Sequence, residues 1–167
     1  MTMMQAAFGQ ESLLTDIIKA HPHNDFILLE PDDDKSDFQV ITFDEANVFS
    51  DPFKYEVIAQ TGKQMDGYFA FMYFDLDEKL VKPFLAACQN LVEQNVNTPG
   101  LNKLMLLKYQ IKNDIQYVII SAWHDAQTYQ VWHDEHYLPA FDRFINIAAK
   151  IESYHEALYH QINLNEK

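Results

Sequence analysis

Two histidines at helical spacing are the first candidates for chemistry in this chain. His133 and His136 lie three residues apart, beside Asp134 and Glu135, in a segment that we expect to be helical. Side chains at this spacing share one face of a helix, and metal sites use imidazole nitrogens presented on one face. The sequence places no convincing third ligand near them, so a solvated helix end is the alternative interpretation.

The other histidines and the cysteine favour structural roles. His124 lies beside Asp125, but adjacent residues at a strand end usually point apart, and Asp125 is placed to cap the next helix. His155 and His160 fall on opposite faces of the last expected strand. Cys88, the one cysteine, shares a helical face with apolar residues, where burial raises the pKa of a thiol and lowers its reactivity. We therefore expect Cys88 to be an inert core residue.

The elements that must position these residues fall into two blocks. Apolar periodicity predicts, in the first block, a strand, a helix and three strands at residues 2–8, 11–20, 25–30, 37–43 and 54–60. The second block reads as strand, helix, two strands, helix and strand, at residues 68–74, 75–94, 101–109, 116–123, 125–149 and 153–164. Within the last helix, Pro139 begins or kinks a further helical piece.

This order of elements predicts an α+β barrel. The second block has the ferredoxin-like order βαββαβ, and the first resembles a truncated copy, βαββ followed by a short strand. Strands 68–74 and 116–123 carry apolar residues on both faces, so another layer must cover the sheet. We expect residues 1–64 to form that layer and to complete the barrel on the ferredoxin-fold domain, residues 65–167. A barrel closed within one chain predicts a monomer, and a homodimer is the alternative.

Charge and hydropathy exclude several classes of partner. The 167 residues carry 12 basic and 25 acidic side chains, a formal charge of -13. Such a negative field repels nucleic acid and anionic lipid surfaces. No apolar stretch approaches the roughly 20 residues of a membrane helix. With no signal peptide evident and no cysteine pair for a disulfide, the chain is expected to be cytoplasmic.

One segment resembles a known family. A strand that ends at Trp123, followed by a helix with Tyr129 and Trp132, is similar to the antibiotic biosynthesis monooxygenase superfamily of dimeric α+β barrels. The greatest likeness is to its two-part heme-degrading monooxygenases and to TRAP-like proteins linked to signalling and stress. Further short segments support this subgroup: 8–9, 13–14, 17, 21–22, 55–58, 61–62 and 98–101.

The resemblance implies heme as cofactor and Trp123 as a catalytic residue. By spacing from Trp132, the axial histidine of the heme-degrading relatives falls at Phe141, and their asparagine falls at Met72 or Tyr73. A phenyl ring cannot bind iron, which leaves His136 as a substitute axial ligand. The expected pocket for heme or another flat aromatic ligand is apolar, and its lining residues are Phe71, Tyr73, Ile119, Trp123, Tyr129 and Phe141.

Three functions compete on this basis. The first is a heme-binding or heme-degrading monooxygenase-like protein, in which Trp123 forms a wall of the pocket. The second is a non-catalytic regulatory protein of the TRAP-like type, which retains the barrel without the heme ligands. The third is an interaction module whose pocket is filled by side chains. In the last two, Trp123 is a core residue, a common place for large aromatic side chains.

Overall fold

The computed structural model describes residues 2–45, 47–146 and 154–164. The strands and helices expected from the sequence occur in the expected order. Their bounds are β1 Met3–Gly9, α1 Glu11–Ala20, β2 Ile27–Pro31, β3 Phe38–Thr42, β4 Phe53–Gly62, β5 Tyr68–Phe74, α2 Glu78–Gln94, β6 Leu101–Ile111, β7 Asp114–Trp123, α3 Ala126–Trp132, η1 His133–Tyr137, α4 Leu138–Ile145 and β8 Tyr154–Ile162. The expected helix end at residue 149 and strand start at residue 153 lie outside the described residues.

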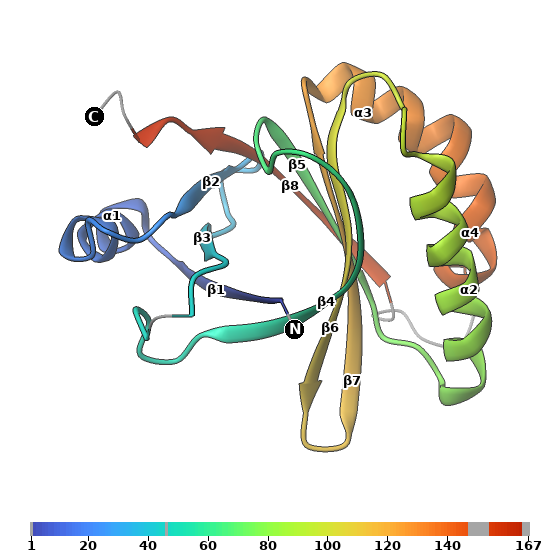
Figure 1. Ribbon diagram of the computed structural model, residues 1–167, viewed down its shortest axis with the longest axis horizontal. Helices are drawn as coiled ribbons and strands as arrows, with labels where there is room; N and C mark the ends of the chain where they lie inside the picture. Colours follow the sequence, from blue (N-terminus) through green and yellow to red (C-terminus); the bar gives the residue numbers. More distant parts are fainter. Residues whose placement is uncertain (1, 46, 147–153, 165–167) are drawn as a thin grey trace.

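The eight strands form one closed barrel. Their order around the barrel is β1-β3-β2-β8-β5-β7-β6-β4, and every neighbouring pair is antiparallel. Two contacts join the halves of the chain, β2 with β8 and β4 with β6, so that β1 to β4 complete the wall that β5 to β8 begin (Figure 1). This confirms the α+β barrel and its closure by the N-terminal block. The closed wall leaves no strand edge unpaired between the halves.

Strand β5 lies between β8 and β7 in the wall and separates two cores. All seven of its side chains are buried, as its continuous apolar sequence predicted. Phe69, Phe71 and Tyr73 point into the barrel, while Ala70 and Met72 point outward. Successive side chains of a strand face opposite sides, which produces this alternation. The interior of the barrel and its helix-covered face are therefore separate environments.

Helices α2, α3 and α4 cover the outer face of the β5 to β8 half, whereas α1 lies on the opposite side of the barrel (Figure 1). Under the three helices, the outer core contains Phe84 and Cys88 of α2 and Phe141 of α4. Cys88 is only 1% exposed, which confirms its expected place in the core. Asp125 caps α3 as expected, because its carboxylate accepts a hydrogen bond from the Thr128 backbone N–H at 2.7 Å. Among the described residues, no helix is long and apolar enough to cross a membrane.

Candidate functional site

The six residues expected to line one pocket lie on two faces of the sheet. Phe71 and Tyr73 belong to the core inside the barrel. The other four belong to the core under the helices: Ile119, Trp123, Tyr129 and Phe141. The structure thus divides the expected pocket, and it brings only the second group together.

The register of β5 against β7 explains this division. Met72 pairs with Ile119 and Phe71 pairs with Ile120, so Phe71 shares its face with Ile120 and not with Ile119. Directly paired residues of antiparallel strands point to the same side of the sheet. Because both strands are apolar on both faces, the sequence pattern does not show which residues lie opposite one another.

A layer of aromatic rings fills the space between the sheet and α3. The ring centroid of Trp123 lies 5.0 Å from that of Trp132 and 6.1 Å from that of Tyr129, and Tyr137 stacks on Trp132 at 5.5 Å. Trp132 donates a hydrogen bond from Nε1 to Asn95 at 3.1 Å. In the described part of the chain, the buried Nε1 of Trp123 has no hydrogen-bond partner. The layer is densely packed, and Trp123 is 0% exposed.

His133 lies at the edge of this layer and joins the helices to β8. Its Nε2 atom lies 2.8 Å from Glu156 Oε2, and its Nδ1 atom lies 2.9 Å from Asp134 Oδ1. The hydroxyl of Tyr154 donates to the same Glu156 oxygen at 2.5 Å and lies 3.0 Å from the hydroxyl of Tyr137. The Glu156 carboxylate therefore contacts both the imidazole of His133 in η1 and the phenol of Tyr154 in β8.

The wide turn η1 positions the two helix residues of this cluster. It is a π-helical turn, a form that is often found at functional sites. His133 begins the turn and Tyr137 ends it, and both are buried. Asp134 and Glu135 between them are exposed. The turn therefore directs His133 and Tyr137 toward β8 and the acidic residues toward solvent.

The cluster favours an ionised pair. The hydrogen bond with Glu156 raises the pKa of His133, although burial opposes protonation of the ring. Burial disfavours the charged form of Glu156, but hydrogen bonds from His133 and Tyr154 outweigh this effect and lower its pKa. Burial raises the pKa of Tyr137, which stays a neutral phenol. The site can thus hold a proton between an imidazole and a carboxylate beside aromatic rings.

The structure separates the two histidines that were considered as a metal pair. His133 is buried against β8, which corrects the interpretation of this position as a solvated helix end. His136 is exposed and borders a groove of about 400 Å³ with Pro99, Trp123 and Trp132. Within residues 2–45, 47–146 and 154–164, no group of three or more His, Cys, Asp or Glu residues could hold a metal ion. Phe141, the position assigned to the axial histidine, is 0% exposed among core residues.

Sequence reasoning missed Glu156 and Tyr154 as members of the cluster. They are separated from His133 by more than 20 positions, and the turn η1 and the strand β8 meet only in the folded chain. One signal was present, because Glu156 is the one acidic residue of β8. On a strand whose outer face packs under helices, such a residue needs a buried partner.

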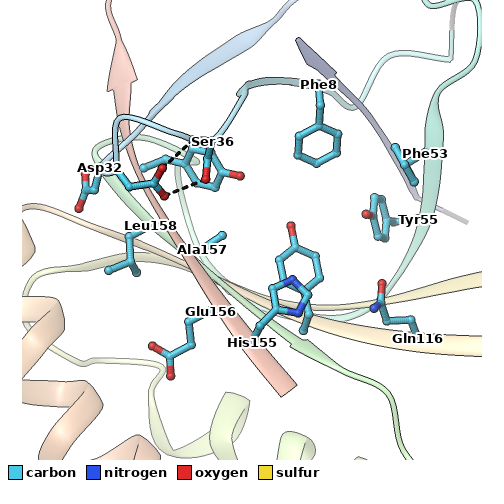
Figure 2. A pocket seen from close by; sticks show the side chains of 13 residues that line it. Phe8, Asp32, Ser36, Phe53, Tyr55, Gln116, His155, Glu156, Ala157 and Leu158 are labelled. Atoms are coloured by element: carbon cyan, nitrogen blue, oxygen red, sulfur yellow. Dashed lines mark hydrogen bonds between the residues drawn. The ribbon is translucent and has the colours of Figure 1, made fainter. Parts of the chain in front are cut away.

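A second hollow lies at the open end of the barrel, on the other side of the sheet. This cavity has a volume of about 570 Å³, and its lining includes Phe8, Tyr55, Tyr73 and His155. In Figure 2 the side chains of Phe8, Tyr55 and His155 point into a common space, while Glu156 points away from it. Tyr73 is thus the one expected pocket residue that lines an open cavity inside the barrel.

Comparison with known proteins identifies the fold. No protein-family model and no curated protein matches the chain. A ferredoxin-fold protein from Listeria monocytogenes, related to antibiotic biosynthesis monooxygenases, superposes with a TM-score of 0.79 at 21% identity, covering 98% of this chain and 95% of that one. The heme-degrading enzyme LmHde from Listeria monocytogenes gives 0.76 at 20% identity, covering 95% and 98%.

A regulator of staphylococcal pathogenesis has the same fold. Its structure superposes with a TM-score of 0.76 at 17% identity and covers 96% of this chain and 99% of that one. The similar structures thus include a protein related to monooxygenases, a heme-degrading enzyme and a regulator. At these identities the common property is the fold, which confirms the likeness to antibiotic biosynthesis monooxygenase-related barrels, and function must be argued from the site.

Proposed function

On the basis of this fold and of the His133 cluster, we propose that the chain is a heme-binding, monooxygenase-like protein. The observation that carries the proposal is the position of His133. The residue is 9% exposed, and its imidazole lies at the edge of the aromatic layer, held by Glu156 at 2.8 Å. An imidazole from the protein is one of the ligands by which proteins hold heme iron.

The donor set fits heme. Imidazole is a common protein ligand of heme iron, and a carboxylate on the second ring nitrogen fixes the orientation and raises the basicity of such a ligand. His133 has a carboxylate at each nitrogen, and Asp134 is the more exposed of the two, with 56% of its side chain accessible. We therefore assign iron binding to the Nδ1 atom of His133, which must lose its proton and its contact with Asp134 when heme binds, and the orienting role to Glu156.

The walls of the site also suit a flat macrocycle. Tyr129 lies 5.4 Å from His133 between ring centroids, and Trp123 lies behind it in the same layer. The buried Nε1 of Trp123, which has no hydrogen-bond partner among the described residues, is a donor that a ligand could use. Because Trp123 and Tyr129 are buried, α3 must move away from the sheet to admit a ligand of this size, while His133 keeps its contact with Glu156.

Heme, when bound, would supply an iron centre able to activate oxygen. The residues of the chain would orient the iron ligand and exclude water. Glu156 holds the imidazole of His133, and the Tyr154 hydroxyl holds Glu156 in turn. The aromatic layer excludes water from the bound face, which strengthens these polar contacts. Trp123 is the residue that we expect to lie against the ring.

A hemin titration followed by absorption tests the proposal. The wild-type protein should give a saturable, shifted Soret band at one equivalent. His133→Gln should weaken binding by roughly tenfold or more, because the amide does not replace the imidazole as an iron ligand. His136→Gln is the matched control, since it changes an exposed histidine of the same segment, and it should bind as the wild type does. Equal affinities for all three proteins would show that His133 is not the ligand.

A non-catalytic regulatory protein is the second candidate, and the packing of the aromatic layer favours it. Trp123, Tyr137 and Phe141 are all fully buried, so the space of the expected pocket is occupied by side chains. A filled layer stabilises the barrel without needing a cofactor. In that case the titration should show no specific band, and His133→Gln should alter stability alone.

A further inference from the structure

The cavity inside the barrel lies outside the proposed heme site, and the sheet separates the two. Its volume of about 570 Å³ falls within the range of roughly 300–1,000 Å³ typical of small-molecule pockets. Tyr73 of β5 and His155 and Ala157 of β8 line it, whereas the side chain of Glu156 points away from it toward His133 (Figure 2). A ligand in this cavity would therefore contact side chains that the heme site does not use.

Aromatic side chains from four strands surround the cavity. They are Phe8 of β1, Phe53 and Tyr55 of β4, Tyr73 of β5 and Tyr159 of β8. In Figure 2, Phe8 and Tyr55 approach one common space from different strands. The face of an aromatic ring carries partial negative charge, and a cation within about 6 Å of the ring centroid is attracted to it. Rings that surround one space therefore favour a cation over a neutral or anionic group of the same size.

The described residues that line the cavity place no positive charge in it. None of them is a lysine or an arginine. His155 is among them, but burial lowers the pKa of its imidazole, which is therefore neutral at physiological pH. Burial likewise raises the pKa of Tyr55 and that of Tyr73, so both phenols keep their protons. The interior walls are thus aromatic and neutral.

Negative charge lies at the rim, in the turn that connects β2 to β3. Residues 32–37 include four aspartates and one lysine, Lys35. Asp33 borders the cavity and accepts hydrogen bonds from the Ser36 hydroxyl at 2.8 Å and from the backbone N–H groups of Lys35 and Ser36. These hydrogen bonds lower the pKa of Asp33, so its carboxylate is ionised at neutral pH. The rim therefore attracts cations and repels carboxylates and phosphates.

Contacts with two strands hold this turn against the barrel. Asp32 accepts a hydrogen bond from the Tyr68 hydroxyl at 2.7 Å, and its other carboxylate oxygen lies 2.6 Å from Nδ1 of His160. The charge of the turn also reaches the aromatic wall. Burial raises the pKa of Tyr159 to about 12, and the negative charge of Asp33 adds to that effect. A cation between the rim and the rings would therefore be attracted by both.

We propose that the barrel cavity binds a quaternary ammonium group, with its alkylated nitrogen among the rings of Phe8, Phe53 and Tyr55 and its charge balanced by the acidic turn. A primary ammonium carries three N–H donors that need acceptors once water is removed. The carboxylate of Asp33 already accepts hydrogen bonds from its own turn, so the cavity attracts a cation mainly through its rings. A quaternary nitrogen has no N–H group to satisfy, and proteins recognise it through aromatic rings. Binding of such a ligand does not depend on the proposed heme site.

Choline and 3,3-dimethylbutan-1-ol test the proposal, because the alcohol has the shape of choline with an uncharged carbon in place of the nitrogen. Each compound is titrated into the full chain at constant ionic strength and followed by NMR chemical shifts. Choline should bind at one saturable site, and the alcohol should bind more weakly by roughly tenfold or more. Nuclear Overhauser contacts between the choline N-methyl protons and the methyl group of Ala157, which lines the cavity, should locate the bound cation.

Two substitutions separate the contribution of the rim from that of the rings. Asp33→Asn keeps an oxygen for the backbone N–H groups of the turn and removes the charge, so it should weaken choline binding by roughly twofold to fivefold and leave alcohol binding unchanged. Phe53→Leu removes an aromatic face from a residue that is 39% exposed, and it should weaken choline binding more than alcohol binding. Glu135→Gln is the control for charge, since it removes an exposed carboxylate from η1 on the helix-covered side of the sheet, and it should bind choline as the wild type does.

The proposal is overturned if choline shows no saturable binding, if the alcohol binds equally well, or if the Overhauser contacts fall on residues under the helices. It is also overturned if Asp33→Asn and Phe53→Leu both bind choline as the wild type does. His133→Gln should leave choline binding unchanged, and Asp33→Asn should bind hemin as the wild type does. The heme proposal and this one can therefore fail separately.

Discussion

His133 Nε2 lies 2.8 Å from Glu156 Oε2, and this contact joins the π-helical turn η1 to the last strand of the barrel. It is a rare link between the helical layer and the sheet, since most other contacts across that layer are apolar. A polar contact between the helices and the sheet affects both ligand binding and the stability of the fold. It fixes the imidazole for ligand binding, and it makes stability depend on pH.

Replacement of the carboxylate should reveal that pH dependence. The raised pKa of His133 stabilises the fold below its unfolded value of about 6.5, and this contribution is lost as pH rises through the folded pKa. The lowered pKa of Glu156 stabilises the fold above about 4.5, and that contribution is lost as pH falls. Glu156→Gln should therefore lower the free energy of unfolding most between these values, by about 1–3 kcal/mol.

Denaturant unfolding of wild type and Glu156→Gln across this pH range measures the difference. Glu93→Gln is a suitable control, because it removes a carboxylate from an exposed position on α2. A difference between wild type and Glu156→Gln that is constant from acid to alkaline pH would show that the pair is not ionised.

Gly67 should not tolerate a side chain. It adopts φ +99°, and a Cβ atom there would lie 2.1 Å from the backbone oxygen of Trp123. Both the left-handed backbone and this contact oppose substitution, so Gly67→Ala should destabilise the fold by about 1–3 kcal/mol or more. Gly9→Ala is the matched control: the nearest atoms to its Cβ would be side-chain atoms of Leu13 and Leu14, none closer than 3.4 Å, and its effect should stay within about 0.5 kcal/mol. Thermal unfolding compares the two, and equal losses would refute the backbone argument.

Cys88 should be inert toward thiol reagents in the native protein. Burial raises the pKa of its thiol, and only 1% of the residue is exposed, so neither thiolate nor access is available. Labelling with a chromogenic disulfide should be slow under native conditions and complete in denaturant. Rapid native labelling would mean that α2 opens readily from the sheet.

The chain should be a monomer in solution. The barrel closes within one chain through the β2–β8 and β4–β6 pairs, so no sheet edge requires a second copy. Light scattering coupled to gel filtration should give a mass near 19.5 kDa at micromolar concentration. A stable particle of twice that mass would contradict this expectation and point to a dimer formed outside the barrel wall.

The sequence alone determined the elements and the architecture. The apolar run of β5 predicted burial on both faces, and the apolar face of α2 placed Cys88 in the core. The ferredoxin-like order of the second block left one sheet face uncovered, and the first block was the only part of the chain able to cover it. These inferences succeeded because periodicity and burial are local properties of a segment.

Only the tertiary structure decided which residues meet. The β5–β7 register placed Phe71 and Tyr73 inside the barrel and Ile119 and Trp123 under the helices, although all four are apolar or aromatic and occupy similar strand positions. The acidic residue Glu156 on β8 signalled a buried partner, but nothing local identified that partner as His133. Register and partner choice arise from the summed packing of all eight strands, and a single segment carries little information about either. For that reason, the sequence revealed the barrel but not its site.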